Sequence, residues 1–217
     1  MTEGGRAPGG ARPARQERSR QTLAKLLDAA ESILSESGLE AATVPAIARR
    51  AGVSVGVVYR RFPDKDALLR SVVRRVVERS VDEDVWAMRR AASVGLSAAA
   101  IAERVVRGVV AANREKAGVL RALHLYLARH PDGEIRRWVE EQNARGLDQV
   151  VELFRPVMAE IRHAEPEVAV RAGVVMVALA LRALLLQGRP LPASLGVEAE
   201  RLDEELVRMY VCYLGLG

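Results

Sequence analysis

Cysteine, aromatic residues and histidine are all scarce in this chain of 217 residues. The one cysteine, Cys212, allows no internal disulfide, so we expect a buried thiol and a reducing, cytoplasmic location. Phe, Trp and Tyr make up 4% of the chain, which disfavours a ligand pocket built from stacked rings. At this length the chain can still bury a core large enough to fold without disulfides.

Patterns typical of catalysis and metal binding are absent as well. The three histidines show no metal-ligand spacing, and no glycine-rich loop of the phosphate-binding type occurs. Glu140 and Glu141 are adjacent, so on a helix they point to different faces and cannot act as a carboxylate pair. We therefore expect that the protein is not an enzyme and that it uses no metal or other cofactor.

Long uninterrupted apolar segments are also lacking. The N-terminus is basic and rich in Gly, Pro and Arg, which is unlike a secretory signal. The most apolar segment, residues 168–186, contains Arg171 and Arg182, whose charges would be costly in lipid. We therefore expect no membrane span, and a helix in this segment that is buried on most sides within protein.

Positive charge, by contrast, is concentrated in the first third of the chain. Residues 1–80 hold 15 Lys and Arg against 9 Asp and Glu, whereas the remaining residues hold 18 against 19. This asymmetry indicates a polyanionic partner for the first part alone. Nucleic acid is the leading candidate, and an acidic membrane surface is the second.

Periodic apolar residues predict helices along almost the whole chain. Residues 1–17 have little to bury and are punctuated by Gly and Pro, so we expect a disordered basic arm there. From Arg18, apolar residues recur at three- and four-residue steps until Gly38, which predicts a helix ended by glycine. Three more helices follow, each preceded by a capping residue: Thr43, Ser54 and Asp64.

Beyond residue 80 the periodicity remains that of helices, and no convincing strand pair occurs. We predict an all-α protein of about nine helices in three parts. These parts are the arm at residues 1–17, a small basic domain at residues 18–65 and a larger helical body at residues 66–217.

The small basic domain has the pattern of a helix-turn-helix, in which two short helices are joined by a turn that contains glycine. At 100° per residue, Val58 and Phe62 face the interior, and Gly56 and Arg60 face away from it. A glycine inside a helix costs roughly 1 kcal/mol relative to alanine, so its presence on an outer face indicates close approach of another surface. Tyr59 can donate to a phosphate, and Arg60 can donate to guanine.

The run TVPAIARRAGVSVGVVYRRFPDKDALL, residues 43–69, resembles the DNA-binding domain of the TetR family of bacterial transcriptional regulators. The resemblance implies that eight positions contact DNA: Thr43, Ser54, Val55, Gly56, Val57, Tyr59, Arg60 and Lys65. Val57 departs from the Thr, Ser or Ala that is common there, and contact with a thymine methyl is a plausible substitute. The local alternatives stay open: Thr43 and Ser54 as caps, Tyr59 as a packing residue and Lys65 as a solvated cation.

The same resemblance implies the roles of the larger body, residues 66–217, in effector binding and dimerisation. It predicts a homodimer through the last two helices, a palindromic double-stranded DNA operator, and repression that a small-molecule effector relieves. Arg182, a cation in an apolar helix, needs an acid across the dimer, solvent or an anionic ligand as partner. Eight residues are candidates to line the effector pocket: Trp86, Met88, Arg121, His124, Trp138, Asn143, Met176 and Arg182. The alternative function is a ligand-sensing or protein-interaction protein without specific DNA binding.

Overall fold

The computed structural model describes the backbone of residues 11–92, 95–131, 133–187 and 199–217. Side chains are described within these ranges except at residues 11–15, 81–92, 185, 187, 199 and 200. In this part of the chain there are nine α-helices, one 3₁₀ helix and no strand, which confirms the all-α prediction. The chain divides into two compact units, residues 1–72 and 73–217, so the division falls beyond the boundary expected at residues 65 and 66.

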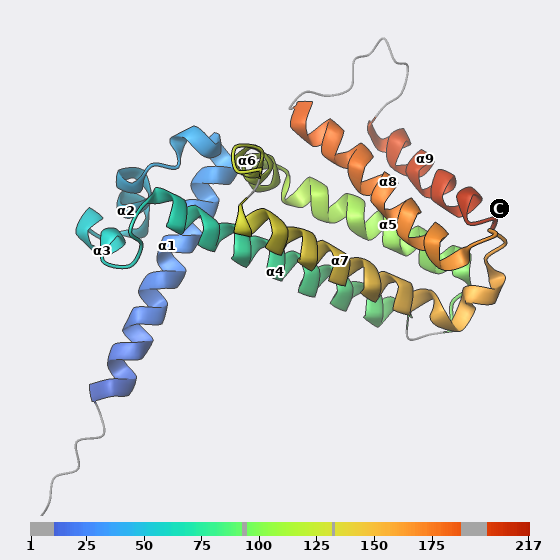
Figure 1. The fold of residues 1–217 in the computed structure, drawn as a ribbon, viewed down its shortest axis with the longest axis horizontal. Coiled ribbons are helices and arrows are strands. Elements are labelled where there is room, and N and C mark those ends of the chain that lie inside the picture. The colour runs from blue at the N-terminus through green and yellow to red at the C-terminus, as the bar shows by residue number, and fades with distance from the viewer. Residues whose placement is uncertain (1–10, 93–94, 132, 188–198) are drawn as a thin grey trace, which may run out of the picture. The chain divides into compact units, whose positions relative to one another are not determined.

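The first unit contains helices α1 (Ala11–Ala41), α2 (Val44–Ala51), α3 (Val55–Tyr59) and the first turns of α4 (Lys65–Ala92) (Figure 1). Its core is built from one apolar stripe on each helix, as the periodicity predicted. The side chains that are almost inaccessible to solvent include Leu26, Leu34, Ile47, Val58, Leu68 and Val72.

Helix α1 begins at Ala11, inside the segment expected to be a disordered arm. The residues from Ala11 to Glu17 are mostly Ala, Arg, Gln and Glu, which favour a helix even in a sequence with few apolar residues to bury. Residues 1–10 of the expected arm lie outside the described residues. Gly38 interrupts the helix with a left-handed φ of 79°, and Leu39 after it is buried, as predicted for a glycine-terminated helix.

The second unit contains the rest of α4 and a bundle of further helices. Figure 1 shows α5, α8 and α9 side by side, and α7 also packs against α5 and α8. The remaining elements are α5 (Ala98–Glu115), α6 (Ala117–Ala128), α7 (Glu134–Phe154), η1 (Arg155–Glu160), α8 (Pro166–Gln187) and α9 (Ala199–Tyr213).

A glycine allows α8 and α9 to approach closely. A β-carbon at Gly173 would lie 2.2 Å from Cε2 and 2.4 Å from Cδ2 of Tyr210, distances that no packed side chain tolerates. The ring of Tyr210 is buried, and its hydroxyl donates a hydrogen bond of 3.1 Å to the carbonyl oxygen of Val170. Burial also raises the pKa of Tyr210. The aromatic ring therefore fills the space that the missing side chain leaves.

Helix α8 is buried on one side and apolar but exposed on the other. Val170, Val174, Val177 and Leu181 face the core. The exposed large apolar residues of this helix are Val168, Val175, Met176, Leu179 and Leu186, with Leu179 55% exposed. This exposed side differs from the helix buried on most sides that the sequence predicted. No helix in the described ranges is long and apolar enough to cross a membrane.

Helix α9 directs most of its apolar stripe into the core of its own unit. Leu206 and Tyr210 are buried, whereas Met209 is 44% exposed. The prediction for Cys212 is wrong, because its thiol is free and exposed. Cys212 lies two residues after Tyr210 in the helix, which turns its side chain away from the buried stripe.

Candidate nucleic-acid interface

Helix α2 begins at the cap and ends at the glycine turn that the sequence predicted. The hydroxyl of Thr43 accepts a hydrogen bond of 3.3 Å from the amide of Ala46, which confirms its role as the cap of α2. Gly52 ends α2 in the left-handed conformation, with φ of 68°, and its amide donates to the carbonyl oxygens of Ala48 and Arg49. The turn after Gly52 is thus fixed by backbone geometry.

Ser54 precedes α3 but does not cap it with its side chain. The prediction of a hydroxyl cap is therefore wrong, and the exposed hydroxyl is available to another partner. The expectation that catalytic patterns are absent from the sequence is wrong in one respect, because residues 52–56, GVSVG, have the spacing of the hydrolase nucleophile motif G-x-S-x-G. That motif requires a strand before the serine, whereas Ser54 lies between two helices, so the match carries no catalytic meaning.

Gly56 has no packing or conformational reason to be glycine. Its φ is not in the left-handed range, and a β-carbon there would meet only the Oγ of Ser54, at 3.9 Å. Val58, two residues after Gly56, is buried, whereas Val55, directly before it, is exposed. The outer face of α3 is therefore smooth at Gly56 and open to close approach.

Tyr59 and Arg60 extend this outer face at the end of α3. Tyr59 is 53% exposed, and Arg60, the C-cap of the helix, is also exposed. Arg60 therefore lies directly after α3. Val57 is partly buried, and Phe62 packs in the core, so the inward and outward sides of α3 are as predicted.

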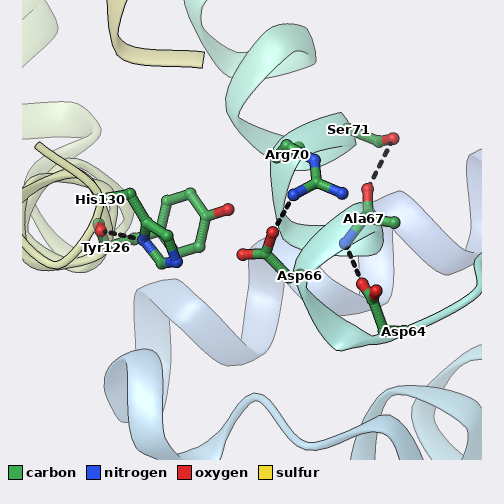
Figure 2. A network of polar contacts seen from close by, with 7 residues as sticks. All are labelled: Asp64, Asp66, Ala67, Arg70, Ser71, Tyr126 and His130. Carbon is green, nitrogen blue, oxygen red and sulfur yellow. Dashed lines mark hydrogen bonds and ion pairs between the residues drawn. The ribbon is translucent and has the colours of Figure 1, made fainter. Parts of the chain in front are cut away.

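Lys65 is the first residue of α4, and the aspartates on either side of it already have hydrogen-bond or ion-pair partners. Asp64 accepts a hydrogen bond of 2.7 Å from the amide of Ala67, and the carboxylate of Asp66 pairs with Arg70 (Figure 2). Within the part of the chain that the structure describes, Lys65 forms no ion pair. A cation without a counter-ion in the first turn of a helix opposes the helix dipole, and an incoming anion would relieve this opposition.

Models of two known domains match this chain over most of its length. The model described as "Bacterial regulatory proteins, tetR family" matches residues 26–72, and the model described as "Tetracyclin repressor-like, C-terminal domain" matches residues 97–214. The chain belongs to the TetR family. The first match covers α2 and α3 and ends at the boundary between the two units.

Relatives of this TetR-family chain with similar sequences match its first part. The HTH-type transcriptional regulator BetI of Burkholderia thailandensis is 40% identical over 91 residues, which are 42% of this chain and 43% of that protein. BetI of Paraburkholderia phymatum is 34% identical over 90 residues, again 42% of each chain. The match thus spans less than half the length of these relatives.

Solved structures of other regulators share the fold over nearly the whole chain. A TetR-family transcriptional regulator from Streptomyces coelicolor has a TM-score of 0.65 at 22% identity, with 95% of this chain and 96% of that chain covered. A transcriptional regulator from Rhodococcus sp. Rha1 has a TM-score of 0.63 at 22% identity, with 89% and 96% covered. The fold of this TetR-family protein is therefore shared well beyond the helix-turn-helix.

Two polar contacts near the helix-turn-helix of this TetR-family chain were not predicted from its sequence. Arg61 reaches Ser19 on α1, and Arg50 pairs with Glu36 of α1 at 2.7 Å. The hydrogen bonds from Arg50 and Ser32 lower the pKa of Glu36 to about 2. The pair Ser32 and Glu36 has helical spacing that a sequence can reveal, but the arginines come from other helices and leave no local pattern.

The effector candidates of this TetR-family chain are spread over α6, α7 and α8. Arg121, His124 and Trp138 are partly exposed, whereas Asn143, Met176 and Arg182 are exposed. Trp86 and Met88 lie in α4, and their side chains fall outside the described residues. Two open hollows of about 430 and 500 Å³ are lined by other described residues. Neither of these two hollows is lined by a residue predicted to bind an effector, so the effector site stays a prediction.

The pKa of His124, an effector candidate of the TetR-family body, is shifted from its ordinary value. Burial, and to a smaller extent the charge of Arg182, lower the pKa of His124. Its Nδ1 lies 2.8 Å from the carbonyl oxygen of Leu120, so Nδ1 carries the proton of the neutral ring. The equivalent contact of His130 with Tyr126 is drawn in Figure 2. In the described parts of the chain no group of three or more His, Cys, Asp or Glu could hold a metal ion.

Proposed function

We propose that this protein is a DNA-binding transcriptional regulator in which α3 and the start of α4 contact double-stranded DNA. The observation that carries the proposal is the outer face of α3, where Gly56 is required by neither backbone conformation nor internal packing. A helix normally loses stability by keeping such a glycine, so the face is suited to contact with an external surface. Exposed Arg60 and partly exposed Lys65, which has no ion pair among the described residues, supply the charge for a polyanion.

The contacts divide into two classes by chemistry. Arg60 can form two parallel hydrogen bonds with the major-groove edge of guanine, and Val57 can contact a thymine methyl. Thr43, Ser54, Tyr59 and Lys65 offer hydroxyl and ammonium donors to phosphates, which fix the position of the protein without reading sequence. Val55 and Gly56 provide the close backbone surface between these groups.

We further propose that two chains associate through the exposed side of α8, with α9 beside it. Contiguous apolar side chains in a monomer are costly in water, and a second copy would cover them. A twofold dimer presents two copies of α3 and therefore matches a palindromic operator. The proposed outcome is repression, relieved when a small molecule binds the helical body.

DNA selection from a random-sequence library, followed by binding titrations, tests the proposal. We expect enrichment of one palindromic sequence, bound with an affinity that falls steeply with salt concentration because phosphate contacts contribute much of it. Failure to prefer any sequence over random DNA, at both low and physiological salt, would contradict the proposal. Sedimentation measurements on the free protein test the dimer separately.

Two single substitutions test the assignment of roles. Arg60→Ala should cost roughly 1 to 3 kcal/mol at one base pair and relax the preference there. Lys65→Ala should weaken binding to all sequences alike and lower the salt dependence. An equal loss on selected and random DNA for Arg60→Ala would place Arg60 among the phosphate contacts.

A further inference from the structure

Arg61 joins the beginning of α1 to the end of α3. Its Nη2 donates to the carbonyl oxygen of Ser19 at 2.8 Å and to the Oγ of Ser19 at 2.7 Å. Both acceptors are uncharged, so the guanidinium keeps its full positive charge while it is held in place. The contact joins α1 to the turn after α3 within the first unit, and Arg61 directly follows Arg60 in the chain.

The segment of α1 that Arg61 holds is basic and exposed. Residues 16–21 are all exposed, and Arg18 and Arg20 stand on either side of Ser19 in the helix. Arg15 and Arg12 precede Ser19 by about one and two helical turns. The one acidic residue in this segment, Glu17, is 200° from Ser19 around the helix, and its carboxylate accepts a hydrogen bond of 3.2 Å from Gln21.

This distribution of charge is unfavourable for the helix alone. The sequence places Arg12, Arg15 and Arg18 at three-residue spacing, and like charges at this spacing are unfavourable in a helix. Neither core packing nor an internal ion pair accounts for the exposed side chains of Arg18 and Arg20 in the described structure. A polyanion beside the end of α3 would turn this repulsion into attraction.

We propose that the exposed beginning of α1 is a second DNA-binding element, which contacts backbone phosphates beside the bases read from α3. In this arrangement Arg18 and Arg20 are phosphate contacts. Arg61 is a positioning residue, because it keeps these arginines next to the recognition helix. The inference rests on the proposed function, since the DNA partner is the one assigned to α3.

The experiment measures the dependence of DNA affinity on salt for the full-length protein. The probes are the duplex that the wild-type protein selects from a random library and a random-sequence duplex of the same length. The variant Arg18→Gln/Arg20→Gln removes two charges per chain, and Arg137→Gln/Arg145→Gln removes two exposed charges from α7 as a matched control. Thermal unfolding followed by circular dichroism shows that each variant is folded.

We expect the slope of log K against log salt concentration to become shallower for Arg18→Gln/Arg20→Gln by about 0.9 for each phosphate that the variant no longer neutralises. A dimer carries two copies of each arginine, so the change should reach about 2 to 4 in all. The α7 control should leave the slope unchanged. Equal slopes for wild type and Arg18→Gln/Arg20→Gln, or equal changes for both pairs, would overturn the inference.

A double-mutant cycle tests the positioning role of Arg61. In an Arg61→Gln background, the further change Arg18→Gln/Arg20→Gln should alter the slope less than it does in the wild type, because the arginines are no longer held. Arg61→Lys keeps the charge and one donor to Ser19, so it should restore most of the difference. Strictly additive changes would show that Arg61 does not position α1.

The two proposals can fail separately. If the wild-type protein selects an operator but the slopes do not differ, the inference about α1 is wrong and the proposed function stands. If no sequence is selected, the proposed function is wrong. The slopes on random DNA then decide the inference about α1 by the same criteria.

Discussion

Replacing Gly56 by alanine should raise the stability of the protein and weaken its binding to DNA. The added β-carbon meets only the Oγ of Ser54, at an ordinary contact distance of 3.9 Å, and the backbone conformation is one that alanine adopts readily. Alanine in place of a helical glycine then stabilises the fold by roughly 0.5 to 1 kcal/mol. On the DNA side, a methyl group inserted into a closely packed interface costs about 1 to 3 kcal/mol. That cost corresponds to a loss of about 5-fold to 150-fold in affinity at each half-site.

Urea unfolding followed by circular dichroism measures the first effect, and titration of the selected duplex measures the second. The matched control is Gly173→Ala, where the same added atom would lie 2.2 Å from the ring of Tyr210 and should have the opposite effect on stability. A Gly56→Ala protein that is less stable than the wild type would refute the claim that the glycine has no internal role. A more stable protein that binds the duplex with unchanged affinity would refute the claim that α3 contacts DNA there.

Three further predictions concern stability and pH. Gly173→Ala should destabilise the folded state by roughly 1 to 3 kcal/mol, because the ring of Tyr210 must move, and urea unfolding measures this loss. His124 has a lowered pKa, so the unfolded state binds its proton more readily and stability falls as the pH drops below about 6.5. His124→Gln should flatten thermal unfolding against pH in that window, and an unchanged profile would assign the acid sensitivity to other groups. Glu36, with a pKa of about 2, stabilises the fold above its ordinary pKa of 4.5 and loses this contribution as the pH falls through about 2. Glu36→Gln should therefore differ in melting temperature from the wild type at pH 6 and converge with it near pH 2.

The order of the helices in the first unit and several of their ends were predictable because their signals are local, whereas the start of α1 at Ala11 was not. Thr43, Asp64, Gly38 and Gly52 act within a few residues of their own positions, and each has the predicted backbone or capping role. The apolar periodicity that placed Val58 inward also left Gly56 outward. A candidate DNA-binding face built from consecutive residues of one helix can thus be recognised without a structure.

The contacts that could not be predicted join residues far apart in the sequence. The partners Arg61 and Ser19 are separated by 42 positions, so no spacing rule connects them. Cys212 was misjudged because a thiol in an apolar helix is usually buried, and only packing shows which side of α9 faces the core. The effector candidates were chosen by residue type alone, and residue type does not show whether side chains from four helices lie close together.

The packing of α8 explains why its sequence is nearly as apolar as that of a membrane span, although no described helix is long and apolar enough to cross a membrane. Two apolar stripes, one through Val170 and Val177 and the other through Val175 and Leu179, run along opposite sides of the same helix. Each stripe alone would give a clear amphipathic signal, but when superposed they cancel and leave a sequence that is apolar all round. The effect of a substitution in α8 should therefore depend on the side of the helix on which it lies, and not on how apolar the residue is. Substitutions on the buried side should change the fold of one chain, and substitutions on the exposed side should change what that chain can associate with.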